Sequence, residues 1–174
     1  MTDWKNIKAL ALDVDGVMTD GSLTAFDNGE IVRTFSAKDT FAIRAALYKG
    51  LLVAVFTGGY AKAIRNRFIS LGVNPREVHM SCRGKIDVFM DFCRRNSISP
   101  EEVVFAGDDI PDIPVLQAAG IGVAPADASA DAKQSADIVS DFGGGHGCIR
   151  DIVEKVLKAK GLWTFDDADY HALF

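Results

Sequence analysis

The chain has 174 residues, enough for one domain with a sizeable core and short for two. Hydrophobic residues make up 48% and charged residues 25%, values typical of an ordinary globular protein. The net charge is −5 and no Lys/Arg cluster exceeds two adjacent residues, which argues against nucleic acid as a partner. The longest apolar run, 51–56, is too short to cross a bilayer, so we also expect no membrane partner.

Directly after the first predicted strand, 7–12, the sequence indicates a hairpin. Ser22–Phe26 and Ile31–Phe35 are strand-like and flank Asp27-Asn28-Gly29-Glu30, in which Asn28-Gly29 is a turn signal. We therefore expect a hairpin over 22–35 that departs from the main sheet.

Short apolar runs and segments of helical period alternate along the rest of the chain. Strands are predicted at 51–56, 78–80, 103–106 and 121–123. The predicted helices are Asp39–Lys49 with Asp39 as its cap, Lys62–Leu71, one containing Ile86 to Cys93, a short one starting at Ser99-Pro100, and Ile149–Lys160. The tail, 162–174, has aromatic residues without a clear period.

This alternation predicts an α/β fold with a parallel sheet covered by helices on both faces, in a single domain over 1–174. Residues 1–13 lack the long apolar run of a signal peptide. The cysteines Cys82, Cys93 and Cys148 have neither zinc-ligand spacing nor a disulfide pattern. We therefore expect a cytoplasmic protein in which these cysteines are packing residues.

Acidic and polar residues follow several predicted strands at the point where each strand ends. Ligands of open parallel sheets bind beyond the carboxyl ends of the strands. The groups expected there are Asp13-Val14-Asp15-Gly16, Thr57-Gly58-Gly59, Gly107-Asp108-Asp109 with Asp112, and Lys85 at the start of a helix. One such aspartate is readily explained as a helix cap, but helix caps do not require the whole set.

Clustered carboxylates repel one another unless a cation lies among them. Hard oxygen ligands favour Mg²⁺, which also takes a substrate phosphate oxygen. Together with Lys85, the cluster predicts a Mg²⁺ site that binds a small anionic phosphate ester.

These ordered motifs resemble the haloacid dehalogenase superfamily. The short chain, the early hairpin and Gly143-Gly144-Gly145-His146-Gly147 before the last helix resemble its capless subfamily of 3-deoxy-D-manno-octulosonate 8-phosphate phosphatases. The resemblance extends to about Lys160. It implies a Rossmann-like three-layer fold without a cap domain, and hydrolysis of a sugar-acid phosphate in cell-surface glycan synthesis.

The chemistry and the resemblance imply roles for individual residues. Asp13 is the expected nucleophile and Asp15 the general acid and base. The expected Mg²⁺ ligands are the Asp13 carboxylate, the Asp15 backbone carbonyl and Asp108, with Asp109 binding through water or orienting Asp108. The phosphate oxygens are expected at Thr57, at the Gly58 amide and at Lys85.

Substrate recognition is harder to assign from the sequence. The resemblance implies arginine at two positions, where this chain has Gly59 and His146. The candidate substrate-binding residues are therefore Asp39, Arg65, Arg67 and His146, with Arg150 as a further possible substitute. His146 can equally be a solvent-facing loop residue, and the glycine run around it can be a simple turn.

Three alternatives remain open. A receiver domain of a signalling relay also uses aspartates, Mg²⁺, Thr and Lys, but its acceptor aspartate follows the third strand and not the first. A catalytically idle binding subunit would keep the same fold. A phosphatase of this type can also act on another sugar phosphate, including nine-carbon sialic-type acid 9-phosphates.

A homotetramer is the expected working unit. The hairpin carries apolar residues that need burial, and an isolated hairpin is marginal in water. The resemblance implies that four hairpins pair at the centre, that residues 36–41 face a neighbouring site and that the tail covers a neighbour's pocket. The alternative is a monomer whose hairpin and tail fold back on their own sheet.

Overall fold

The computed structural model describes residues 3–173, and its centre is a six-stranded sheet in the order β5-β4-β1-β6-β7-β8. All neighbouring strands pair in parallel. The strands are β1 (Ala9–Leu12), β4 (Leu52–Phe56), β5 (Val78–His79), β6 (Val103–Ala106), β7 (Ile121–Ala124) and β8 (Ile138–Val139). The predicted parallel α/β sheet is confirmed, and its apolar strands are nearly all buried.

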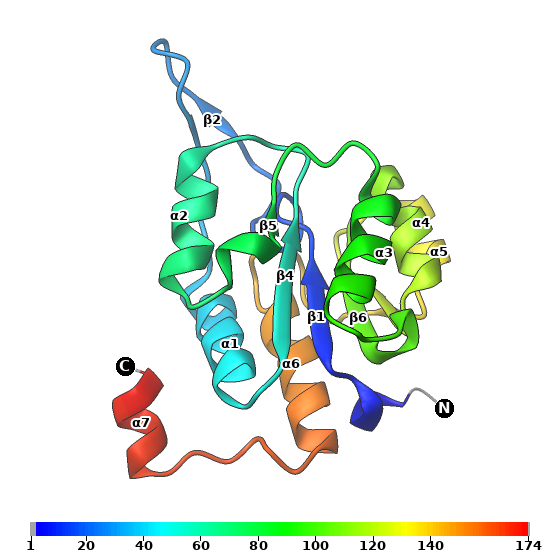
Figure 1. Ribbon diagram of the computed structural model, residues 1–174. Helices are drawn as coiled ribbons and strands as arrows, with labels where there is room; N and C mark the ends of the chain where they lie inside the picture. Colours follow the sequence, from blue (N-terminus) through cyan, green and yellow to red (C-terminus); the bar gives the residue numbers. More distant parts are fainter. Residues whose placement is uncertain (1–2, 174) are drawn as a thin grey trace.

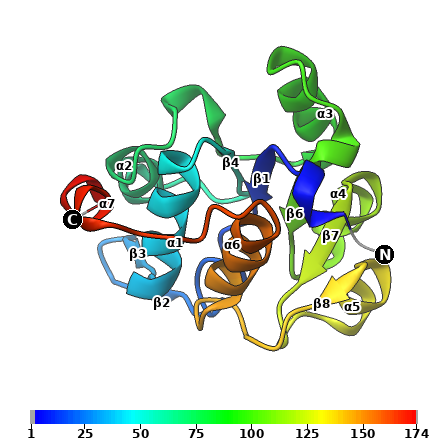
Figure 2. The ribbon, with the colours of Figure 1, turned by 90° about the horizontal axis from the view of Figure 1, so that it is seen from below.

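Helices cover both faces of this sheet, as Figures 1 and 2 show. One face carries α1 (Ala37–Tyr48), α2 (Lys62–Ser70) and α6 (Cys148–Ala159), and the other carries α3 (Lys85–Arg95), α4 (Ile113–Ala118) and α5 (Ala130–Ser135). Short 3-10 helices lie at Trp4–Asn6, Pro75–Glu77, Pro100–Glu102 and Ile110–Asp112. The predicted capping box at Ser99 is present at the third of these.

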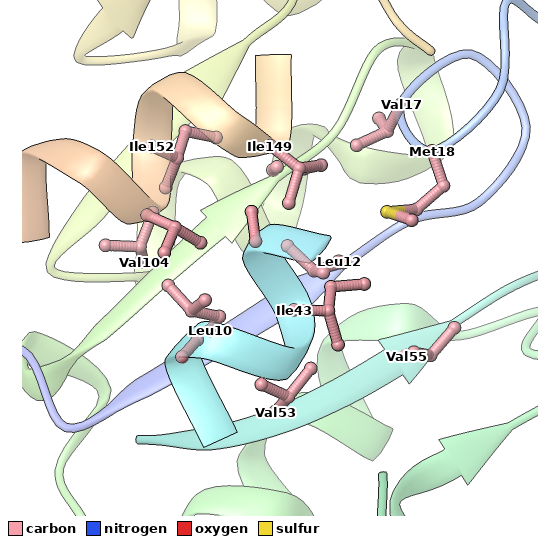
Figure 3. Close-up of a cluster of buried hydrophobic side chains, with 14 of the residues drawn as sticks. Leu10, Leu12, Val17, Met18, Ile43, Val53, Val55, Val104, Ile149 and Ile152 are labelled. Carbon is pink, nitrogen blue, oxygen red and sulfur yellow. The ribbon is translucent and has the colours of Figure 1, made fainter. Parts of the chain in front are cut away.

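The core fixes β1 in the middle of the molecule. Figure 3 shows Leu10 and Leu12 of β1 pointing toward Ile43 of α1 and Ile149 of α6. These side chains are fully buried. Full burial of a Leu or Ile side chain contributes about 1.5–3 kcal/mol each. These buried contacts therefore hold β1, and the start of the loop that follows it, in a fixed position.

The hairpin extends from the main body beyond the carboxyl ends of the strands (Figure 1). Its strands, β2 (Thr24–Ala25) and β3 (Ile31–Val32), pair antiparallel and are shorter than predicted. The turn is closed by the Gly29 amide, which donates to the Phe26 carbonyl, and by the Asn28 side chain, which accepts from the Glu30 amide.

The prediction that Asp39 caps α1 is wrong. The cap is Ser36, whose hydroxyl accepts from the Asp39 amide, and Asp39 lies within the first turn. The Asp39 carboxylate is fully buried and instead accepts from the amides of Gly147 and Arg150, at 3.0 and 2.9 Å. Asp39 of α1 therefore caps the start of α6.

The tail folds back on its own chain. Residues Asp167–Leu173 form helix α7, which packs on α1 at the end of the molecule opposite the hairpin (Figure 1). Lys49 Nζ lies 3.0 Å from Asp169 Oδ1, and Arg44 donates to the Leu173 carbonyl at 3.1 Å. The tail thus packs on helix α1 of its own chain; Phe174 lies outside the described residues.

Candidate active site

Four segments bring the predicted groups to the carboxyl edge of the sheet. Asp13 directly follows β1, and its amide donates to the Ala106 carbonyl at 3.0 Å. Thr57 follows β4, Asp108 lies two residues beyond β6, and Lys85 begins α3. They meet at a cavity of about 560 Å³ lined by Asp13, Asp15, Gly21, Thr57, Gly58, Gly59, Cys82, Arg83, Lys85, Asp108, Asp109, Pro111 and Asp112.

A buried lysine joins two carboxylates at the bottom of this cavity. Lys85 Nζ lies 2.8 Å from Asp13 Oδ1 and 2.6 Å from Asp112 Oδ1. The three side chains are almost completely buried. Because a buried charge without a partner is costly, this arrangement fixes all three in one geometry.

Burial and neighbouring carboxylates raise the pKa values of two aspartates in this cluster. Burial, followed by repulsion from Asp112, raises the pKa of Asp13 to about 7, although Lys85 acts in the opposite direction. Burial and the neighbours Asp112 and Asp109 raise the pKa of Asp108 to about 6. A cation among these groups would stabilise their ionised forms.

The donor set fits a hard divalent cation. Carboxylate oxygens of Asp13, Asp108 and Asp112 lie within 4.8 Å of one another. Asp112 is also engaged elsewhere, since its Oδ2 accepts from the amides of Asp108 and Asp109 at 3.0 and 3.3 Å. Asp109, predicted as a ligand, lines the cavity but lies outside this three-carboxylate cluster.

Backbone packs closely behind the nucleophile loop. At Gly16, whose φ is +87°, an added Cβ would lie 2.1 Å from Asp108 Oδ2. At Gly144 it would lie 1.9 Å from the Gly16 carbonyl oxygen, and the Gly145 amide donates to the Val17 carbonyl at 3.0 Å. The glycine run before α6 therefore packs against the nucleophile loop from behind, and is not a simple turn.

The Thr57 loop is held in place by its own hydrogen bonds. Thr57 is buried, and its hydroxyl accepts from the Gly59 amide at 3.0 Å. The Thr57 amide donates to the His79 carbonyl of β5, also at 3.0 Å. The hydroxyl and the glycine backbone thus line the same cavity as Asp13.

The general-base candidate Asp15 has a partner that the sequence did not suggest. Arg33 of the hairpin binds the Asp15 carboxylate through Nε at 2.5 Å and Nη2 at 3.0 Å. The hydrogen bond to Asp15 raises the pKa of Arg33, although burial opposes this. An added Cβ at Gly59 would lie 3.2 Å from Arg33 Nη2, so glycine leaves room for the guanidinium.

The candidate substrate-binding residues lie elsewhere. Arg65 donates to the Val78 carbonyl at 3.3 Å, and Arg67 lines a separate cavity beside α7. His146 and Arg150 line a third cavity of about 370 Å³, and Asp39 is buried as described above. None of these five lines the cavity that contains Asp13. Arg33 and Arg83, which the sequence reasoning did not single out, are the arginines at the site.

Comparison with known proteins decides the family. The chain is 37% identical over 161 residues to the 3-deoxy-D-manno-octulosonate 8-phosphate phosphatase KdsC of Salmonella typhi, covering 92% of this chain and 85% of that protein. The chain belongs to the haloacid dehalogenase superfamily, with the octulosonate phosphatases. Residues 83–149 also match the family of haloacid dehalogenase-like hydrolases.

Solved structures of this superfamily share the fold. The cobalt-bound phosphatase YrbI of Haemophilus influenzae has a TM-score of 0.89 and 32% identity, covering 95% of this chain and 96% of that one. A Moraxella catarrhalis octulosonate phosphatase in complex with magnesium, phosphate and KDO has a TM-score of 0.87 and 25% identity, covering 99% and 96%. The receiver-domain alternative is therefore discarded. Among residues 3–173, no helix is long and apolar enough to cross a membrane.

Proposed function

We propose that this protein hydrolyses 3-deoxy-D-manno-octulosonate 8-phosphate (KDO 8-phosphate) to KDO and inorganic phosphate, with Mg²⁺ as its cofactor. The observation that supports this most directly is the carboxylate cluster around Asp13 and Lys85 in a chain 37% identical to KdsC. The Asp13 carboxylate, the Asp15 backbone carbonyl and Asp108 would hold the ion. When bound, the ion would neutralise charge on the phosphoryl group and on the carboxylates.

Asp13 is the proposed nucleophile. Its carboxylate oxygen forms a bond to phosphorus while the bond from phosphorus to the sugar oxygen breaks. Asp15 donates a proton to that leaving oxygen. Water then attacks the phosphorus of the acyl phosphate, Asp15 takes a proton from the water, and phosphate leaves as the Asp13 carboxylate is restored.

The other groups of the cavity would bind the phosphoryl oxygens. Thr57, with its hydroxyl, and Gly58, with its backbone amide, line the same cavity as Asp13. Lys85, already 2.8 Å from Asp13, offsets negative charge on both the nucleophile and the phosphate. In this proposal the protein's own groups orient the ester before the nucleophile attacks.

Activity assays with the Asp13→Asn variant test the proposal. This nearly isosteric change should keep the fold and lower turnover by several orders of magnitude. EDTA should remove the wild-type activity and Mg²⁺ should restore it. Activity of Asp13→Asn above a few per cent, or full activity after exhaustive chelation, would contradict the mechanism.

The substrate is tested separately from the mechanism. The kcat/KM values of the wild type for KDO 8-phosphate and for a nine-carbon sialic-type acid 9-phosphate should favour the eight-carbon acid. The opposite order would assign the protein to the nine-carbon substrate and leave the mechanism intact. No turnover of any phosphate ester, activated aryl esters included, would favour the idle binding subunit.

We further propose a single catalytic domain over 1–174 that assembles as a homotetramer in the cytoplasm. Four hairpin side chains, Leu23, Phe26, Ile31 and Val32, are 48–53% exposed in the single chain, which supports burial against other copies. Cys82, Cys93 and Cys148 are free thiols, consistent with a reducing compartment. Light scattering should give four times the chain mass; an active monomer at nanomolar concentration would exclude the assembly.

A further inference from the structure

Arg83 has an unusual position on the wall of the active-site cavity. It lies in the loop between β5 and α3, two residues before Lys85, and it is exposed. Within residues 3–173 its guanidinium makes no hydrogen bond and no ion pair. An arginine on a cavity wall whose donors are all available is suited to bind an anion from solution.

The backbone that carries Arg83 is well fixed. The Ser81 amide donates to the Gly59 carbonyl at 3.2 Å, and the Cys82 amide donates to the Thr57 carbonyl at 3.0 Å. Ser81 has a φ of +56°, a conformation that a non-glycine residue adopts only when its surroundings hold it there. The loop before Arg83 is thus attached to the loop of the proposed phosphate-binding groups.

The charges of the cavity leave one cation available for a second anionic group. Among the described residues, the basic side chains on its wall are Lys85 and Arg83, and Lys85 is bound to Asp13 and Asp112. Arg33 is not on the wall and is bound to Asp15. Five aspartates line the same cavity and would repel a carboxylate, so the carboxylate of a sugar acid needs a cation on the cavity wall.

We propose that Arg83 is the specificity-determining residue that binds the carboxylate of the substrate. The inference rests on the proposed function and adds a recognition group for the acid end of the sugar. The phosphate of KDO 8-phosphate is on C8 and its carboxylate is C1, at opposite ends of the carbon chain. The planar guanidinium can donate two parallel hydrogen bonds to that carboxylate, a geometry that the ammonium of lysine cannot provide.

The test compares Arg83→Ala with the wild type on three substrates: KDO 8-phosphate, a neutral sugar phosphate that lacks a carboxylate, and an aryl phosphate. For the acid, KM should rise about ten- to hundredfold, the usual loss when one hydrogen-bonded charge pair is removed, with kcat changed less than about twofold. For the other two substrates, KM and kcat should stay within about twofold of the wild type. Arg83→Lys should recover part of the affinity for the acid.

Two further measurements separate recognition from general effects. Arg76→Ala removes the same charge from an exposed site outside the cavity and should leave all three substrates unaffected. Calorimetric titration with KDO, which has the carboxylate but no phosphate, should show weaker binding to Arg83→Ala than to the wild type. An unchanged KM for the acid, or an equal rise for the neutral sugar phosphate, would overturn the inference.

Failure of the proposed function would appear differently, as absence of turnover in the wild type itself. If the wild type prefers the nine-carbon acid, that substrate also carries a carboxylate and takes the place of KDO 8-phosphate.

Discussion

Mg²⁺ affinity should depend steeply on pH, because the proposed ligands must lose protons to bind the ion. In the metal-free protein the pKa of Asp13 is raised to about 7 and that of Asp108 to about 6. At pH 8 both groups are ionised. A pH of 5 is two units below the pKa of Asp13 and one unit below that of Asp108, so both carboxyl groups are mostly protonated. The apparent Kd for Mg²⁺ should therefore weaken about a thousandfold, or about 4 kcal/mol.

Isothermal titration calorimetry measures both the affinity and the protons. Titrations in two buffers of different ionisation enthalpy should show release of about two protons per Mg²⁺ at pH 5 and almost none at pH 8. Asp13→Asn is the matched control: it leaves Asp108 as the remaining titrating ligand, so the change in Kd should shrink to about tenfold. A wild-type Kd at pH 5 within tenfold of the pH 8 value, without proton release, would refute the reasoning.

Three substitutions test residues that hold catalytic groups or the start of α6 in position. Arg33→Ala should release Asp15 and lower kcat for sugar phosphates about tenfold or more, with Arg33→Lys intermediate, in assays run alongside light scattering to check assembly. Lys85→Met should destabilise the metal-free protein by about 3 kcal/mol at pH 8, because it leaves buried carboxylates unpaired. That loss, measured by urea unfolding, should be smaller at pH 5, where the raised pKa of Asp13 leaves it protonated. Asp39→Ala should cost about 1–3 kcal/mol in the same assay, since the amides of Gly147 and Arg150 lose their acceptor, and unchanged stability would contradict that cap.

The sheet could be predicted because its strands are short, continuous apolar runs. β1, β4 and β6 are read directly from such runs, and the rule that ligands bind at strand ends places Asp13, Thr57 and Asp108 together. β8 has two residues, and α4 and α5 have six each, too few for a periodic pattern. The weakest strand prediction, 78–80, rests on a short apolar run and corresponds to β5, which has only two residues.

The errors arose where distant contacts decide the structure. Ser36 and Asp39 are both good helix caps, and a contact between Asp39 and residues more than 100 positions away settles which one caps α1. Arg33 lies just after β3, where the chain leads back from the hairpin to α1, and no local pattern encodes its contact with Asp15. Arg83 had a weak signal in the sequence, since it lies two residues before Lys85.

The close packing of Gly144 on Gly16 links two segments that are 128 positions apart in the sequence. A methyl group at Gly144 would push the nucleophile loop from behind, although Gly144 itself is not among the residues that line the cavity. A scan of all single substitutions should therefore find two separate regions of intolerance, one at the aspartate motif and one at the glycine run. Compensating changes between homologues should couple these two regions, because neither backbone can shift unless the other does.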